Sequence, residues 1–141
     1  MGYLARSAGS DLLPSDDRII DVMRWLSWAS NHFTRHAGNL YFQHIIKPAF
    51  LKAEPDPVAV AEASGFLKQF AAVLDAHLKG RKYLVGDGLT IADFAVAVTL
   101  PHAEKAKLPL AEFKEIARWH DRLNAMPAWR QPFPANSAAA A

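Results

Sequence analysis

The chain reads Tyr83-Leu84-Val85-Gly86-Asp87-Gly88-Leu89-Thr90-Ile91-Ala92-Asp93-Phe94 where a turn gives way to a helix. The Thr90-x-x-Asp93 spacing predicts a capping box. In it the threonine hydroxyl accepts a hydrogen bond from the Asp93 amide, and the carboxylate accepts one from the Thr90 amide. Leu89 and Phe94 occupy the two positions of a hydrophobic staple, which fixes the angle at which the chain enters the helix. We therefore interpret Asp93 as a structural carboxylate and not as a catalytic one.

The helix that follows this box is almost uncharged as far as Leu100. A helix that is apolar on nearly every side is a buried one, so we expect it at the centre of the domain, ended or kinked by Pro101. The preceding Gly86-Asp87-Gly88 is too short for a phosphate-binding loop and has no lysine after it. We interpret it as a turn that needs a positive φ.

Apolar residues recur at helical spacing along most of the chain, and the alternation of a strand is confined to Tyr83–Val85. An N-terminal cap at Asp56 and a left-handed end at Gly80 bound one helix, whereas Gly38 ends the first helix and Pro48 kinks or splits the second. The expected helices cover residues 15–36, 40–52, 57–78, 90–100 and 110–124, with a short last turn from Pro127. The predicted fold class is all-α, a helical bundle.

The 141 residues make about one domain, and 51% of them are hydrophobic, which excludes collagen-like and disordered classes. A net charge of +2 without a basic run gives little support for nucleic acid as a partner. The absence of cysteine excludes disulfides, zinc-thiolate sites and a cysteine nucleophile. Because no apolar stretch reaches the length of a membrane span, we expect a soluble, cytoplasmic protein without a membrane partner.

The first expected helix has two faces. Two tryptophans, a histidine and an arginine form a stripe opposite the core-facing stripe, and packing within that helix does not explain them. The stripe packs against the helix from Leu40, or it meets another domain, a second subunit or a ligand. The outer stripe is Trp25, Trp28, His32 and Arg35, and the core-facing stripe is Ile19, Val22, Met23, Leu26, Ala29, Ser30 and Phe33.

His32 and His36 are spaced so that both could bind one metal ion, but no third ligand is apparent, and we predict no metal site. The serines of the predicted helices lack a Gly-x-Ser-x-Gly turn, which argues against a hydrolase triad. We therefore expect no catalytic residue within this chain.

The segment Tyr83–Asp93 resembles the capping-box and staple segment of the helical C-terminal domain of cytosolic glutathione S-transferases. Other pieces similar to bacterial members follow in the same order, and the resemblance covers about residues 3–133. They are Leu12-Leu13-Pro14, Trp25-Leu26-Ser27-Trp28, Leu74-Asp75-Ala76-His77-Leu78, Arg118-Trp119 and Pro127-Ala128-Trp129.

This resemblance implies a division of the chain and a missing partner domain. Residues 1–14 would be the end of an interdomain linker region, 15–133 the helical transferase-like domain, and 134–141 a disordered tail or vector remnant. In that family the thiol-activating residue and the grip on the γ-glutamyl group belong to an N-terminal thioredoxin-like domain, which this sequence lacks. The chain alone should therefore be inactive.

The resemblance also implies a function for the intact protein. It would be a detoxifying transferase and a homodimer, which conjugates glutathione, its co-substrate, to small hydrophobic electrophiles. Trp28, His32, Thr34 and Arg35 are then candidates for the substrate or glutathione cleft, although only the basic Arg35 matches the residue type of the members compared. The alternative is a non-catalytic interaction module, such as those appended to translation factors or aminoacyl-tRNA synthetases.

Overall fold

The computed structural model describes residues 2–132, which fold into helices and contain no strand. The predicted all-α class is confirmed, and the predicted tail over 134–141 lies outside the described residues. None of the helices in the described part is long and apolar enough to cross a lipid bilayer. The elements are α1 (Gly2–Ser7), α2 (Arg18–Trp28), the π-helical η1 (Ala29–Phe33), α3 (Thr34–Tyr41), the π-helical η2 (Phe42–Leu51), α4 (Pro57–Leu78), α5 (Ile91–Ala97), the 3-10 turn η3 (Leu100–His102), α6 (Lys114–Asn124) and α7 (Pro127–Arg130).

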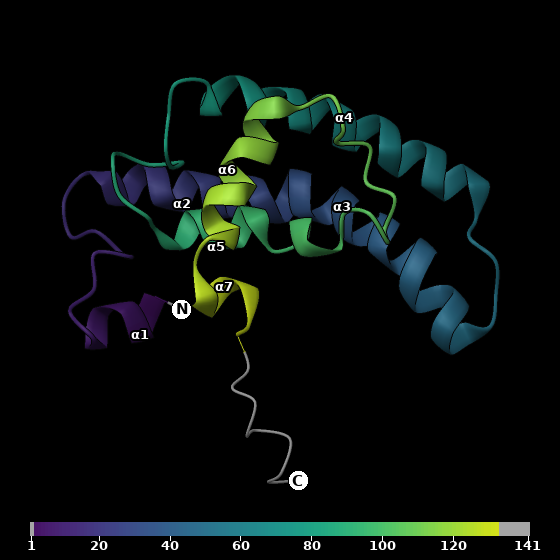
Figure 1. Cartoon of the computed structure of the whole chain (residues 1–141), viewed down its shortest axis with the longest axis horizontal. Helices are drawn as coiled ribbons and strands as arrows, with labels where there is room; N and C mark the ends of the chain where they lie inside the picture. Colours follow the sequence, from purple (N-terminus) through teal and green to yellow (C-terminus); the bar gives the residue numbers. More distant parts are fainter. Residues whose placement is uncertain (1, 133–141) are drawn as a thin grey trace, which may run out of the picture.

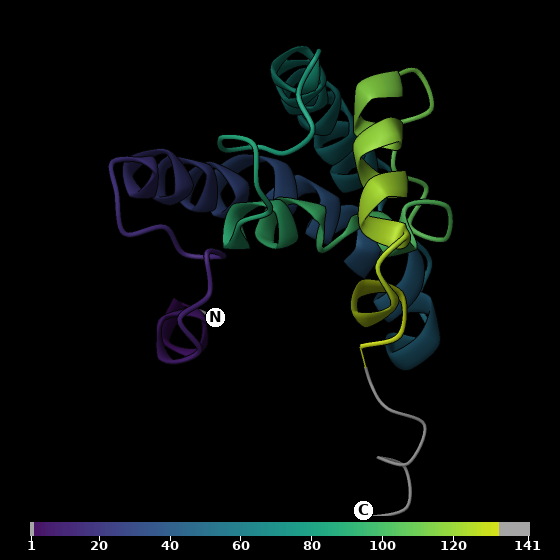
Figure 2. The same cartoon turned by 60° about the vertical axis from the view of Figure 1, so that its left-hand side comes forward.

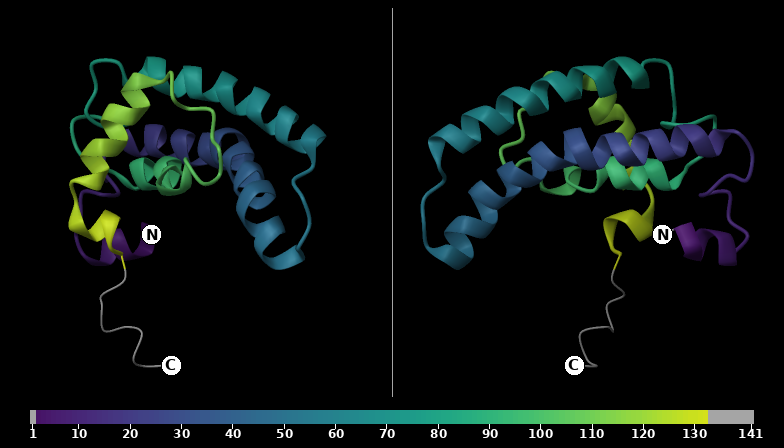
Figure 3. Two further views of the ribbon diagram at one scale, coloured as in Figure 1. Left: turned by 45° about the vertical axis from the view of Figure 1, so that its right-hand side comes forward. Right: turned by 180° about the vertical axis from the view of Figure 1, so that it is seen from behind.

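The elements from α2 to η2 form one helical run that bends over α3 and η2 (Figure 3). The predicted break at Gly38 is wrong: Gly38 lies inside α3, between Ala37 and the wholly buried Leu40. Burial of these neighbours outweighs the roughly 1 kcal/mol that a glycine costs within a helix. The run begins at Arg18 and not at Ser15, and the Asp16 carboxylate accepts from the Arg18 amide at 3.0 Å.

Core packing in the first half of this run differs from the predicted stripe. Val22, Ala29 and Phe33 are buried as expected, but Met23 is 49% exposed and Ser30 is also exposed. Trp25, which we placed on the outer stripe, is only 7% exposed. The buried arc is therefore rotated toward Trp25.

The long helix α4 returns alongside η1 and α3 (Figure 1). Its start is confirmed, because Asp56 Oδ1 accepts from the Val58 amide at 2.9 Å and Pro57 takes the first helical position. Its end is confirmed as well, since Gly80 has a φ of +73°. One stripe of this helix enters the core: Ala63, Leu67, Ala71, Leu74 and Leu78.

The helix α5 lies beneath α2, and most of its residues are buried as predicted. It ends at Ala97, before the predicted Leu100, and Pro101 lies in η3. One side is not covered, because Val98, directly after the helix, is 52% exposed. Both α1 and α7 lie on the side of α5 that faces away from α4 (Figure 2).

The helix α6 crosses the end of α4, and the two helices cap each other. Asp75 Oδ1 of α4 accepts from the Glu115 and Ile116 amides at 2.8 and 3.1 Å. Arg118 Nη2 of α6 donates to the carbonyl oxygens of Leu78 and Arg81 at 3.0 and 2.9 Å. Because the Asp75 carboxylate occupies the helix end, α6 begins at Lys114 instead of the predicted residue 110.

Candidate functional site

The Asp93 carboxylate lies at the start of α5 and is wholly buried. The Thr90–Asp93 capping box forms, with the Thr90 amide 2.9 Å and the Thr90 hydroxyl 3.1 Å from Oδ2. The Leu84 amide and Trp119 Nε1 donate to Oδ1 at 2.9 and 3.0 Å, two partners that spacing within the loop did not indicate. We call these four residues, Leu84, Thr90, Asp93 and Trp119, the polar knot.

The polar knot has no capacity for substrate chemistry. Burial raises the pKa of Asp93, and the hydrogen bonds from Leu84, Thr90 and Trp119 offset part of that rise. In all four hydrogen bonds the carboxylate is the acceptor, and no part of the Asp93 side chain is exposed to solvent. This arrangement supports the structural role that the sequence predicted for Asp93.

The outer stripe of the first helical run packs against α4, not against the segment from Leu40. We call the stacked rings between them the aromatic ladder: Trp25, Trp28, His32 and His36 from α2 to α3, and Phe66, Phe70 and His77 from α4. The His32 ring stacks on Phe70 with centroids 4.6 Å apart, and Trp28 meets the same Phe70 ring edge-on at 6.2 Å. The His36 ring stacks on Phe66 at 4.9 Å. Contact with α4 thus accounts for most of the stripe.

The four cleft candidates of the sequence do not gather in one place. Trp28 and His32 lie 6.3 Å apart in the aromatic ladder. Thr34 faces the opposite side, where its hydroxyl donates to the Ala95 carbonyl of α5 at 3.4 Å. Arg35 is exposed. Among the four, the hydrogen bond to the buried helix is made by Thr34.

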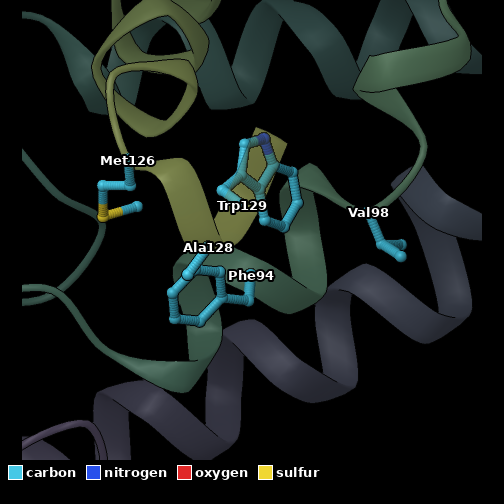
Figure 4. A pocket seen from close by; sticks show the side chains of 5 residues that line it. All are labelled: Phe94, Val98, Met126, Ala128 and Trp129. Atoms are coloured by element: carbon cyan, nitrogen blue, oxygen red, sulfur yellow. The ribbon is translucent and has the colours of Figure 1, made fainter. Parts of the chain in front are cut away.

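A groove runs along the uncovered side of α5. Its middle section is a pocket of about 320 Å³, in which the Phe94 and Trp129 rings lie 5.6 Å apart (Figure 4). Leu89, the other expected staple residue, is partly buried and packs against the core. This volume is in the range of pockets that hold small organic molecules. Its lining is Phe94, Val98, Met126, Ala128 and Trp129.

The groove continues in both directions, and we call the three sections together the α5 groove. Toward α1, a pocket of about 270 Å³ shares Phe94 with the middle section and is also lined by Leu4 and Ala8. Toward η3, a pocket of about 440 Å³ shares Val98, Ala128 and Trp129 with it. This last section adds the polar side chains of His102 and Arg130.

The chemistry available in the α5 groove is binding. Its middle is lined by apolar side chains alone, the α1 section includes the hydroxyl of Ser10, and the basic side chains lie at the η3 end. Within residues 2–132 no three histidine, aspartate or glutamate side chains are placed to hold a metal ion. Sequence reasoning missed this groove, although the signal was a tryptophan in the short turn Pro127-Ala128-Trp129 after the last amphipathic helix.

Residues 38–127 match the family described as glutathione S-transferase, C-terminal domain, over more than half of the chain. The chain belongs to the glutathione S-transferase family. It is 33% identical over 129 residues to glutathione S-transferase 3 of Zea mays, an alignment that covers 89% of this chain and 57% of the maize protein. This chain thus spans just over half the length of the maize transferase.

A solved structure of glutathione S-transferase III in its apo form superimposes with a TM-score of 0.81 at 31% identity, covering 94% of this chain and 65% of the other. The helical domain of the transferase fold is therefore present in this chain. A relative with another kind of name, elongation factor 1-gamma-A of Xenopus laevis, is 28% identical over 121 residues, covering 82% of this chain and 27% of that protein.

Proposed function

We propose that this chain is the electrophile-binding and dimerisation domain of a cytoplasmic, detoxifying glutathione transferase. The α5 groove carries this proposal, because it offers an apolar pocket of small-molecule size without a reactive side chain in its middle section. Glutathione thiolate, supplied beside the groove, would attack an electrophile held against Phe94 and Trp129 in the middle section. Membership of the family supports this proposal.

The activation of glutathione would come from a thioredoxin-like domain. The chain has no cysteine, and its buried carboxylate, Asp93, is held by four donors. We place that domain against the α1 end of the α5 groove, where Tyr3 and Leu4 are 83% and 68% exposed. Thr34, beside α5, and Arg35, one residue later, are the candidates for contact with glutathione.

A chimera tests the proposal. This chain is fused after the thioredoxin-like domain of the maize relative, in place of that relative's own helical domain. Conjugation of glutathione to 1-chloro-2,4-dinitrobenzene is then measured. We expect turnover by the chimera, none by this chain alone, and a lower kcat/KM on Trp129→Ala. Turnover by the purified 141-residue chain would contradict the division of labour, and a folded but inactive chimera would contradict the proposed function.

Dimerisation is proposed through the outer edge of the aromatic ladder. Apolar surface is exposed there, because Val73, at 53% exposure, lines a pocket together with Trp25 and Trp28. A patch of this kind on a monomer marks an interface, and in a two-fold dimer it meets itself around Trp28. Sedimentation of wild type and of Trp28→Ala should show a dimer that weakens on substitution. A wild-type chain that stays monomeric at high concentration would contradict the proposed dimer interface.

The runner-up function is a non-catalytic interaction module, favoured by the similarity to an elongation factor subunit. The chimera separates the two functions, since an interaction module needs no electrophile pocket. If Trp129→Ala left turnover unchanged while the chimera remained active, the α5 groove would lose its role in catalysis and the interaction module would gain support.

A further inference from the structure

The α5 groove has an apolar body and one basic end. From Phe94 to Trp129 its walls are aromatic and aliphatic, whereas the section beyond Val98 ends on His102 and Arg130. No carboxylate lines either section. A long ligand would thus meet a graded environment, apolar first and cationic last.

Arg130 is placed to act on a ligand. It is the last residue of α7, directly after the Trp129 ring that forms the groove wall. Its side chain is exposed, and none of the ion pairs among residues 2–132 includes it. A guanidinium next to an apolar wall binds a carboxylate or sulfonate by charge-assisted hydrogen bonds, which are stronger where water is partly excluded.

A second arginine in a similar setting serves as a control. Arg24 lines a pocket of about 270 Å³ with Trp25, Trp28 and Val73 of the α2 and α4 side. Unlike Arg130, it is paired with a carboxylate, with its Nη2 2.9 Å from Asp21 Oδ1. A ligand anion would have to displace that carboxylate, so the pocket beside Arg24 should discriminate charge less.

We propose that the α5 groove selects electrophiles with an apolar body and an anionic group at one end, and that Arg130 reads the charge. This proposal rests on the proposed function, because it names the substrate class of the same groove. Amphiphilic carboxylates with a reactive double bond or carbonyl in their apolar part fit this description. The anion would lie at Arg130, and the reactive part would lie in the middle section, against Phe94 and Trp129.

Two fluorescent probes that differ in charge test it on the purified chain. These are 8-anilinonaphthalene-1-sulfonate and its neutral counterpart N-phenyl-1-naphthylamine, which share the aromatic body. We expect Arg130→Gln to weaken binding of the sulfonate about 5-fold, as for a partly exposed charge pair, and to leave the neutral probe within 2-fold. Arg130→Lys should retain most of the affinity, and Trp129→Ala should weaken both probes.

Arg24→Gln is the matched control, since it removes the same charge from the opposite side of the molecule and should change neither affinity. The proposal would be overturned by any of three results. These are weaker binding of the sulfonate probe to Arg24→Gln, an equal loss of affinity for both probes on Arg130→Gln, and no binding of either probe to the wild-type chain. Neither glutathione nor a second domain enters this measurement. Failure of the chimera therefore leaves the charge selectivity standing, and failure of Arg130→Gln leaves turnover by the chimera standing.

Discussion

The polar knot and the aromatic ladder hold this domain together in opposite ways. In the knot, donors from Leu84, Thr90 and Trp119 meet a single carboxylate that has no exposure. In the ladder, rings from the first helical run and from α4 lie with centroids 4.5 to 6.3 Å apart, some stacked and some edge-on, and most are partly exposed. Stability concentrated in one buried group is lost with a single substitution, whereas stability spread over many ring contacts tolerates single losses.

The largest effect is expected for Asp93→Ala. The substitution leaves the donors of Leu84, Thr90 and Trp119 buried without an acceptor, so we expect a loss of about 3 to 5 kcal/mol in the free energy of unfolding. Urea unfolding followed by circular dichroism measures it.

Asp93→Asn is the control that separates charge from hydrogen bonding. It removes the buried charge but turns one acceptor oxygen into an amide that faces donors, so it should still destabilise, by less than Asp93→Ala. A more stable Asp93→Asn variant would mean that burial of the charge, and not the set of donors, dominates at this site.

Trp119→Phe weakens the same knot from its other side. It removes one donor to Oδ1 and leaves a small cavity at a wholly buried position, while the Leu84 amide still satisfies that oxygen. We expect a loss of about 2 kcal/mol, measured by the same urea titration. A loss equal to that of Asp93→Ala would show that the knot fails as a unit.

Phe70→Ala is the matching test of the ladder. The half-buried Phe70 ring contacts Trp28, His32 and His36, and its removal should cost about 1 to 2 kcal/mol, because the other ring pairs remain. Thermal unfolding of this variant and of Asp93→Ala, side by side, checks the order. A larger loss of thermal stability on Phe70→Ala than on Asp93→Ala would contradict this order.

The smallest effect concerns pH. Burial, and then the nearby Arg35, lowers the pKa of His36, so the folded state favours its neutral form. Neutral His36 therefore adds to the free energy of unfolding above pH 6.5, and this gain is lost as the pH falls through the lowered pKa. His36→Gln should therefore lose less stability between pH 7 and 5 than wild type, by under about 1 kcal/mol, in urea titrations at the two pH values.

Two other groups give this pH test its controls. Burial lowers the pKa of His120 as well, so a residual acid dependence should persist in His36→Gln. Asp93 changes the free energy of unfolding in the opposite direction with pH. Because its pKa is raised, the stability that its protonated form adds is lost as the pH rises above 3.8. If the stability of His36→Gln fell between pH 7 and 5 as much as that of wild type, His36 would not contribute to the acid dependence.

Features with local causes could be predicted from the sequence. The Asp56-Pro57 cap, the left-handed Gly80 and the Thr90–Asp93 box each involve residues a few positions apart, and each is present. Gly38 failed as a helix end because burial of its neighbours, a tertiary effect, decides the conformation there.

The rest depends on segments that meet only after folding. Trp119 reaches Asp93 across 26 residues. The helix α4, which covers Trp28 and His32, follows them only after α3, η2 and a turn. The α5 groove forms where Phe94 meets Trp129, so neither segment alone shows a pocket. Helical spacing indicated which side chains share a face, but it could not name the surface that each face meets.

The mutual caps of α4 and α6 have a consequence for the order of folding. Asp75 and the amides at the start of α6 lie about 40 residues apart, and no side chain of α6's own N-cap position satisfies those amides. The start of α6 thus gains its acceptor only when a long loop has closed, whereas α4 carries its cap at Asp56 within its own first turn. Nucleation should therefore begin in α4 and reach α6 late, so that loss of the Asp75 cap accelerates unfolding and hardly slows refolding in a chevron experiment.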